Sequence, residues 1–314
     1  MTRTVAVTGA TGFIGGHLVQ RLGADGWTVR ILARQLPVHP HFGRMPVEAV
    51  IGALDDEGSL RELVEDVDAV VHAAGLIKAR SRADFFATNA AGVARLAKVA
   101  AGQPSPPRFI LISTLAAREP TLSSYAASKR AGETALAEIA DLAWTIIRPP
   151  AIYGPGDRET LAFFRAVAKG VAPLLGSDKA RLSLLHVQDL SSAVAVLLSQ
   201  AGEVGATHEI DDGRPGGYSW RELIETAAAH LGTTPRTIRV PRPLLHAVAA
   251  TNGLLARLSG RVPILTADKV REICHSDWVC HDQVFGNRTG WSPAVSLKQG
   301  FAGTIGWYRQ QGWL

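Results

Sequence analysis

The stretch "VAVTGATGFIGGHLV" (residues 5–19) places three glycines between an apolar run and a helical pattern. Glycines here let the chain turn sharply and let backbone N–H groups approach a pyrophosphate, which the N-terminus of the following helix also favours. The spacing is GxxGxxG rather than the commoner GxGxxG, so the glycines alone are weak evidence. Their placement predicts dinucleotide binding, rather than a turn without a ligand, through a set that comprises Gly9, Thr11, Gly12, Phe13, Ile14 and Gly15.

The first half of the chain repeats this alternation of strand and helix. Apolar runs predict strands at residues 4–10, 28–34, 68–74, 108–114 and 143–149. These runs are nearly continuous, which is typical of strands covered on both faces. Helical patterns are found at 13–25, 58–65, 84–101 and 124–140. The alternation predicts an α/β fold with a doubly wound parallel (Rossmann) sheet.

After residue 150 the alternation of strands and helices becomes less regular. "IYGPGD" is expected as a loop, residues 180–200 as a strand and a helix, and 218–232, 241–260 and 296–311 as segments containing helices. These segments predict a smaller, discontinuous, mixed α/β substrate lobe. The expected dinucleotide-binding domain comprises 1–155 and about 183–204, and the expected substrate-binding lobe comprises about 156–182 and 205–314.

Composition narrows the function classes. The 314 residues are 46% hydrophobic and 19% charged, as in globular proteins, and the net charge of +5 is spread without a Lys/Arg block, which gives nucleic-acid binding little support. No uninterrupted apolar run of 18 or more residues predicts a membrane span. The first residues lack the features of a signal peptide, and two cysteines argue against a disulfide framework, so a cytoplasmic location is expected.

Two other segments are discounted as sites. "CHSDWVCH" (274–281) has a spacing unlike the C-x2–4-C hairpins of structural zinc sites, so packing is favoured and no metal is expected. The apolar stretch 243–258 is interrupted by His246, Asn252 and Arg257, which favours packing over membrane contact.

The second predicted strand ends in "ILAR", with Ala33 and Arg34 where an NAD-binding chain usually carries Asp or Glu. A carboxylate would accept hydrogen bonds from the adenosine ribose, whereas a guanidinium suits a 2′-phosphate. Arg34 therefore favours NADP over NAD, and the alternative is a solvated loop residue.

"SSYAASKRAGE" (123–133) holds Tyr125 and Lys129 about one helical turn apart, so both side chains share a face. Alone, this spacing is typical of an ordinary solvated helix. With its context, the chain resembles the extended short-chain dehydrogenase/reductase superfamily of epimerase/dehydratase-like proteins. The resemblance rests on "TGATGFIGG", "VVHAAG", "TNAAGVARLAKVA", "ISTLAA", "YAASK", "IIRPPAIYGPGD" and "HVQDL" in that order, and on the last residues, 290–314.

The resemblance implies hydride transfer between a nicotinamide and a small carbonyl or alcohol substrate. Tyr125 would donate or accept the proton, and Lys129 would hold the nicotinamide ribose and lower the phenol pKa. Thr114 would position the substrate oxygen, with its neighbour Ser113 as the alternative. The resemblance also assigns cofactor contacts to Ala73, Ala74, Asn89, Pro149 and Ile152, and it makes a homodimer possible through residues 84–101 and 124–140.

The chain departs from the superfamily pattern at three places, and these departures leave alternative functions open. Gly52–Ala53 replaces the common "GD" pair near adenine. The short separation of Thr114 and Tyr125 resembles an atypical branch that includes an accessory subunit of respiratory complex I, so a non-catalytic NADPH-binding assembly protein is one alternative. Another is a nucleotide-sugar epimerase or dehydratase, although Leu182 stands where such enzymes often carry arginine. Residues 180–190 and 241–266 look more like members that act on apolar or aromatic ketones.

Overall fold

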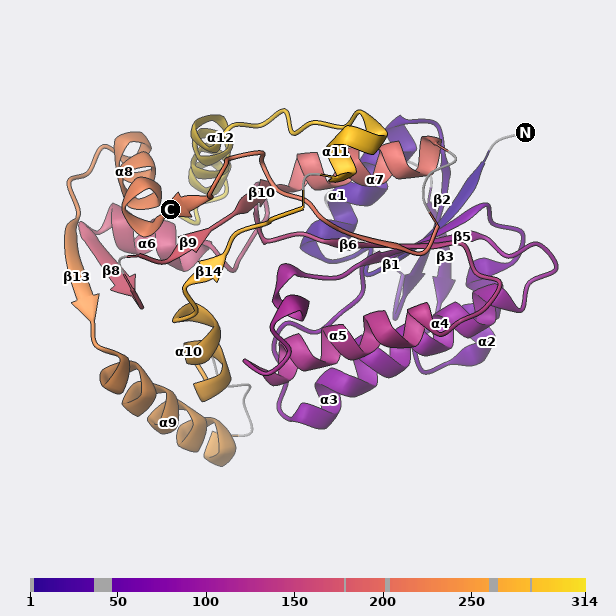
Figure 1. Cartoon of the computed structure of the whole chain (residues 1–314), viewed down its shortest axis with the longest axis horizontal. Helices are drawn as coiled ribbons and strands as arrows, with labels where there is room; N and C mark the ends of the chain where they lie inside the picture. The colour runs from indigo at the N-terminus through magenta and orange to yellow at the C-terminus, as the bar shows by residue number, and fades with distance from the viewer. Residues whose placement is uncertain (1–2, 37–46, 178, 201–203, 260–264, 283) are drawn as a thin grey trace. The chain divides into compact units, whose positions relative to one another are not determined.

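The computed structural model describes residues 3–36, 47–177, 179–200, 204–259, 265–282 and 284–314 (Figure 1). Contacts divide the chain into two units. The first unit comprises Met1–Arg148, Leu190–Glu209 and Gln283–Trp291, and the second comprises Pro149–Asp189, Ile210–Asp282 and Ser292–Leu314.

The first unit is built on a seven-stranded sheet with the order β11-β6-β5-β4-β1-β2-β3. Every neighbouring pair in it is parallel. Because the order reverses direction between β1 and β4, the sheet is doubly wound, and the predicted fold class is confirmed. The strands are β1 (Thr4–Thr8), β2 (Thr28–Ala33), β3 (Val47–Ile51), β4 (Ala69–His72), β5 (Arg108–Ile112), β6 (Trp144–Arg148) and β11 (Ala206–Glu209).

Helices cover both faces of this sheet, with α1 on one side and α2, α4 and α5 on the other (Figure 1). The second face closes over a core in which Val70 and Phe109 of the strands contact Leu96 and Leu136 of the helices. The strands are continuously apolar because both of their faces are buried in this way. The helices are α1 (Phe13–Ala24), α2 (Glu57–Val64), α3 (Arg82–Phe86), α4 (Gly92–Ala101), α5 (Ser124–Ala137), α7 (Val187–Ser199) and α11 (Val284–Thr289). Most of α7 belongs to this unit.

The second unit packs three helices around an aromatic core that contains Phe164, Phe301 and Tyr308. Its strands form small sheets of two or three strands rather than one large sheet. The helices are α6 (Leu161–Ala168), α8 (Trp220–Leu231), α9 (Arg242–Ser259), α10 (Ala267–Ile273) and α12 (Leu297–Gln310). The strands are β7 (Ala151–Tyr153), β8 (Val171–Leu175), β9 (Arg181–Leu182), β10 (Leu184–His186), β12 (Tyr218–Ser219), β13 (Arg236–Val240) and β14 (Asp277–Trp278).

No helix in the described part of the chain combines the length and the apolar character that crossing a bilayer requires.

Candidate active site

The glycine turn lies at the point where the strand order reverses. Gly9 follows β1 with φ of +71°, and a Cβ there would lie 2.7 Å from the backbone of Ala73 and of Ala74, which follow β4. A Cβ on Gly15 would lie 2.0 Å from the Gly9 carbonyl oxygen. The turn, the end of β4 and the start of α1 can approach this closely only because side chains are absent. This edge of a doubly wound sheet is where such folds bind dinucleotides.

The N-terminus of α1 is electrostatically suited to an anion. Its cap, Gly12, makes no side-chain hydrogen bond, and the first turn carries no acidic residue. The first N–H groups of a helix lack intrahelical partners and carry the positive end of the helix dipole. The start of α1 can therefore hold a pyrophosphate through its backbone.

Gly15→Ala is expected to weaken NADPH binding by at least about tenfold, because the new methyl group must displace the Gly9 carbonyl at a cost of roughly 1–3 kcal/mol. Titration calorimetry measures the Kd. Gly303→Ala on α12 is the matched control, since nothing lies within 4 Å of its Cβ position. The control should leave NADPH binding unchanged and stabilise the fold by about 0.5–1 kcal/mol. Equal NADPH affinity in both variants would contradict a tight phosphate turn.

Arg34 is exposed directly after β2. Among the residues that the structure describes, none accepts a hydrogen bond or forms an ion pair with its guanidinium. No carboxylate occupies the end of this strand. The end of β2 thus offers a guanidinium and no carboxylate.

A buried histidine beneath the glycine turn was not singled out from the sequence. His72 is the last residue of β4, and Thr8 on the neighbouring strand β1 is in register with it. The Nδ1 of His72 lies 2.8 Å from the Oγ1 of Thr8. Burial, together with the charge of Lys129, lowers the pKa of His72 to about 3, so the imidazole is neutral. Its Nε2 has no hydrogen-bond partner among the described residues.

Asn89 ties the chain after β4 to α5. It lies in a π turn, Ala87–Ala91, between α3 and α4. Its amide accepts from the Leu76 N–H at 2.8 Å, donates to the Leu76 carbonyl at 2.9 Å and donates to Ser128 Oγ at 3.0 Å. A Cβ on Gly132 would lie 2.2 Å from the Asn89 carbonyl oxygen, so the two helices touch through their backbones. Both the oxygen and the nitrogen of the Asn89 amide therefore hold the segment after β4 against α5, the helix that carries Lys129.

Tyr125 and Lys129 both lie on α5, which starts where Ser123 Oγ accepts from the Ala126 N–H at 2.9 Å. Tyr125 is half-buried, with its ring centre 6.1 Å from that of Phe85. Lys129 is buried, and its Nζ donates to the Ile112 carbonyl at 2.8 Å. Burial lowers the pKa of Lys129 to about 8, although the negative charge of Glu133 acts to raise it. The alternative of an ordinary solvated helix face, which the spacing alone allowed, therefore does not hold for Lys129.

The structure distinguishes Ser113 from Thr114. Ser113 is buried, and its hydroxyl donates to Glu133 Oε1. Thr114 is half-buried, and its Oγ1 accepts from the Ala116 N–H at 3.2 Å as the cap of the 3₁₀ turn Leu115–Arg118. A hydroxyl that accepts in this way can still donate its proton. Thr114 is thus the one whose O–H is suited to bonding a substrate oxygen.

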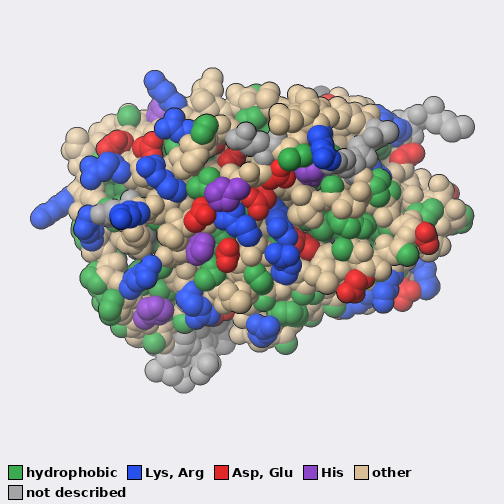
Figure 2. Space-filling model, viewed as in Figure 1, with side chains coloured by type: hydrophobic (Ala, Val, Ile, Leu, Met, Phe, Trp, Pro, Cys, Tyr) green, Lys and Arg blue, Asp and Glu red, His purple; other side chains and the backbone are tan. Residues whose placement is uncertain are grey.

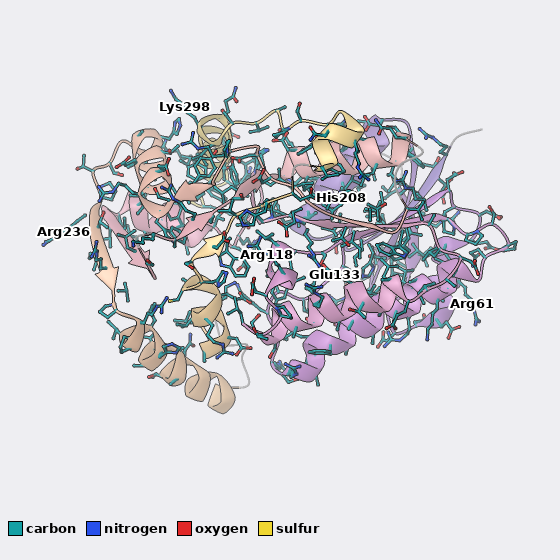
Figure 3. All side chains as sticks on the ribbon, in the orientation of Figure 1. Arg61, Arg118, Glu133, His208, Arg236 and Lys298 are labelled. Atoms are coloured by element: carbon teal, nitrogen blue, oxygen red, sulfur yellow. The ribbon has the colours of Figure 1, made fainter. Side chains whose placement is uncertain are left out.

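Glu133 lies on α5 one helical turn after Lys129, on the same face as Tyr125 and Lys129. It was not predicted as a site residue. Glu133, labelled in Figure 3, is almost fully buried. Arg148 donates to it twice, from Nε at 2.9 Å and Nη2 at 2.6 Å. Burial acts to lower the pKa of Arg148, but the hydrogen bonds and charge of Glu133 and the charge of Glu209 raise it overall. The i, i+4, i+8 spacing was the available signal in the sequence.

The described first unit thus gathers the glycine turn, Ala73, Ala74, Asn89, Thr114 and Lys129 around the carboxyl ends of β1, β4 and β5. Of the other predicted cofactor contacts, Arg34 and Tyr125 also belong to the first unit, whereas Pro149 and Ile152 belong to the second. Ile152 lies on β7, in register with Leu185 of β10.

The discounted cysteine segment shows structural contacts. Cys274 is buried at the end of α10, and Trp278 Nε1 donates to the Glu272 carbonyl at 2.8 Å. In the parts that the structure describes, no three His, Cys, Asp or Glu side chains gather as a metal site would require.

Comparisons with known proteins agree with this geometry. The sequence model of the NAD dependent epimerase/dehydratase family matches residues 5–210. A ceramide reductase of Caulobacter vibrioides is 43% identical over 311 residues, which cover 99% of this chain and 96% of that protein. The mitochondrial NADH dehydrogenase (ubiquinone) 1 alpha subcomplex subunit 9 of Arabidopsis thaliana is 29% identical over 251 residues, 78% of this chain and 62% of that protein. The structure of gox2253 matches with a TM-score of 0.81, covering 100% of both chains at 20% identity, which supports the fold alone.

Proposed function

Because this chain belongs to the NAD dependent epimerase/dehydratase family, we propose that it is an NADP-dependent reductase for the ketone of a ceramide-type lipid. That it is an NAD(P)-dependent oxidoreductase follows from the family and from its reductase relatives. The substrate class rests on the full-length similarity to a ceramide reductase. The observation that carries the proposal is the buried Lys129 on the same helix as Tyr125, with its Nζ bonded to the last residue of β5 and 3.8 Å from the Cβ position of Gly75 after β4.

The side chains have separate roles in this reduction. The Thr114 hydroxyl donates to the carbonyl oxygen and holds it near Tyr125. The Tyr125 phenol gives its proton to that oxygen as the carbonyl becomes an alcohol. Lys129, while charged, stabilises the phenolate that remains and so lowers the phenol pKa. When bound, the nicotinamide supplies the hydride for the carbonyl carbon.

The retained residues favour turnover over a purely structural role. A protein that only stores NADPH needs the glycine turn and Arg34, but not a proton donor beside a buried lysine. Desolvating the Lys129 ammonium lowers its pKa to about 8, which is unfavourable for the charged form. Strongly perturbed groups of this kind are concentrated at sites of chemistry.

NADPH oxidation followed by absorbance tests the proposed function. A panel would contain a ceramide with one backbone hydroxyl oxidised to a ketone, a soluble aromatic ketone and UDP-glucose. Turnover with the oxidised ceramide supports the proposal. NADPH binding without turnover on any ketone would favour the non-catalytic alternative, and a nucleotide sugar converted without net NADPH oxidation would favour the epimerase alternative.

Arg34→Ala is expected to weaken NADPH binding by roughly tenfold or more and to leave NADH binding nearly unchanged, because a charge-assisted bond to the 2′-phosphate contributes about 1.5–3 kcal/mol. Fluorescence titration with both cofactors measures the ratio of the two Kd values. Arg61→Ala on the exposed side of α2 is the control for a general loss of positive charge, since Arg61 pairs with Glu57 across one helical turn. A wild-type preference for NADH would contradict the role of Arg34.

A further inference from the structure

Within the described part of the second unit, the exposed large apolar side chains cluster on three elements. They are Val171 of β8, Ile238 of β13, and Leu244 and Val248 of α9, with exposed fractions of 40%, 46%, 54% and 48%. β8 and β13 pair with each other, and α9 follows β13 after a single residue. Apolar groups confined to one contiguous region mark an interaction surface rather than random exposure.

The pairing register shows that the β8–β13 sheet has an inner and an outer face. Ala172 is fully buried, and β8 packs on α6. Val171 and Pro173 point to the opposite side, because successive side chains alternate. They lie in register with Arg236 and Ile238. The outer face of this sheet therefore presents Val171, Pro173 and Ile238 together with a guanidinium.

Helix α9 also has one covered side and one open side. Leu245 and Ala249 are buried against Val270 and Cys274 of the α10 segment. Leu244 and Val248 are one turn apart, so they share a face. About half of each side chain remains exposed, which means that the contacts with α10 do not cover them. The packing predicted for residues 243–258 is therefore found on the side of α9 that carries Leu245 and Ala249, and it does not cover Leu244 and Val248.

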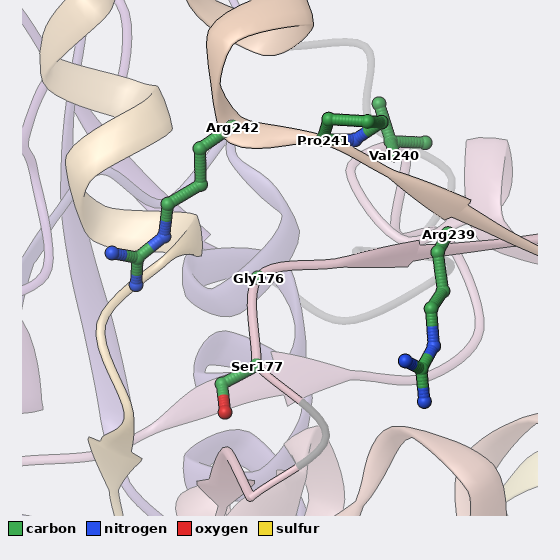
Figure 4. A pocket seen from close by; sticks show the side chains of 6 residues that line it. All are labelled: Gly176, Ser177, Arg239, Val240, Pro241 and Arg242. Atoms are coloured by element: carbon green, nitrogen blue, oxygen red, sulfur yellow. The ribbon is translucent and has the colours of Figure 1, made fainter.

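The charge of this region has a single sign. Residues 226–267 contain five arginines and neither Asp nor Glu. Arg236 extends away from β13 (Figure 3). Arg239 alternates to the other face of β13, and Arg242 Nη2 donates to the Cys274 carbonyl at 2.9 Å. These two arginines line a cavity of about 540 Å³ with Ser177, Val240 and Pro241 (Figure 4). In Figure 2, hydrophobic side chains lie beside those of Arg and His at the lower left, where Figure 1 draws α9. Exposed apolar side chains beside the guanidinium of Arg236, in a stretch without acidic residues, match the boundary between the acyl chains and the headgroups of an anionic bilayer.

We propose that the β13–α9 face, defined by Val171, Arg236, Ile238, Leu244 and Val248, binds the surface of an anionic phospholipid bilayer. The binding is interfacial: Leu244, Val248 and Ile238 enter the headgroup boundary, and Arg236 pairs with a lipid phosphate. The physiological role that we assign to this membrane contact rests on the proposed function, because a ceramide-type substrate resides in a membrane. The contact itself is a property of the second unit and does not need turnover.

Co-sedimentation of the full chain with vesicles tests the proposal. Wild-type protein should bind vesicles of phosphatidylcholine mixed with phosphatidylglycerol at least about tenfold more tightly than vesicles of phosphatidylcholine alone, and added salt should weaken the binding. L244S/V248S should weaken binding to the mixed vesicles by about tenfold or more. Arg236→Gln should weaken it by about fivefold.

Two exposed positions outside the β13–α9 face serve as matched controls. Val204→Ser removes an apolar side chain that is 63% exposed in the first unit, and Lys298→Gln removes an exposed charge from α12. Both should bind mixed vesicles like the wild type, and circular dichroism checks that every variant is folded. No binding by wild-type protein, or equal binding by L244S/V248S, would overturn the proposal. So would a wild-type dimer that L244S/V248S converts to a monomer, because a second copy would then cover the face. Because sedimentation needs no substrate, these outcomes are independent of whether a ceramide-type ketone is reduced.

Discussion

Tyr125→Phe is expected to lower kcat for ketone reduction by about 10²–10⁴-fold, while the Kd for NADPH stays within about twofold of the wild-type value. Phenylalanine keeps the ring that packs near Phe85, at a centroid distance of 6.1 Å, so the fold of α5 should persist. What is lost is the hydroxyl that gives its proton to the carbonyl oxygen. Steady-state kinetics with the oxidised ceramide and titration calorimetry with NADPH measure the two quantities.

Tyr218→Phe is the control for this substitution. It removes a phenol hydroxyl that donates to Asp212 at 2.7 Å within the second unit, whereas Tyr125 belongs to the first. Its kcat should stay within a few-fold of wild type. A Tyr125→Phe variant that kept most of the wild-type kcat would contradict the assigned proton donor.

Glu133→Gln is expected to destabilise the fold by about 3 kcal/mol, because it leaves the Arg148 guanidinium largely buried without its counter-charge. Glu133 accepts two hydrogen bonds from Arg148 and one from Ser113, and its side chain is only 5% exposed. Urea unfolding gives the free-energy difference. E133M/R148M removes both charges and should be less destabilised than Glu133→Gln alone, which is the signature of a coupled pair.

The same substitution should change the pH profile. Lys129 has a pKa of about 8, so it is charged below that pH and loses its charge as the pH rises through it. The Glu133 carboxylate raises this pKa, so Glu133→Gln should lower it and move the alkaline fall in kcat to lower pH, by roughly one unit. Lower stability with an unchanged pH profile would make Glu133 a structural residue only.

The elements that the sequence predicted well are those with strong, repeated patterns. The strands that became β1, β2, β4, β5 and β6 are covered on both sides, so their apolar runs are unbroken. The edge strands β3 and β11 were not among the predicted strands. Residues of β3 are partly exposed, and β11 reads "ATHE", so neither has the apolar pattern of a central strand.

The site was predictable where a backbone constraint dictates residue type. Gly9 and Gly15 stand where any side chain would strike the backbone, and this requirement is visible in the motif. His72, Glu133 and the π turn around Asn89 depend on contacts between segments distant in sequence. Such contacts leave no periodicity for a single sequence to reveal.

The central claim is that this chain passes a hydride from NADPH to a ketone carbon while Tyr125 supplies the proton. Mass spectrometry of the product formed with NADPH carrying deuterium at the reactive nicotinamide carbon tests it most directly. The account predicts one deuterium on the new carbinol carbon with wild-type protein and almost none with Tyr125→Phe. An alcohol product without deuterium from either face of the labelled nicotinamide, or no product despite saturating NADPH and oxidised ceramide, would contradict it.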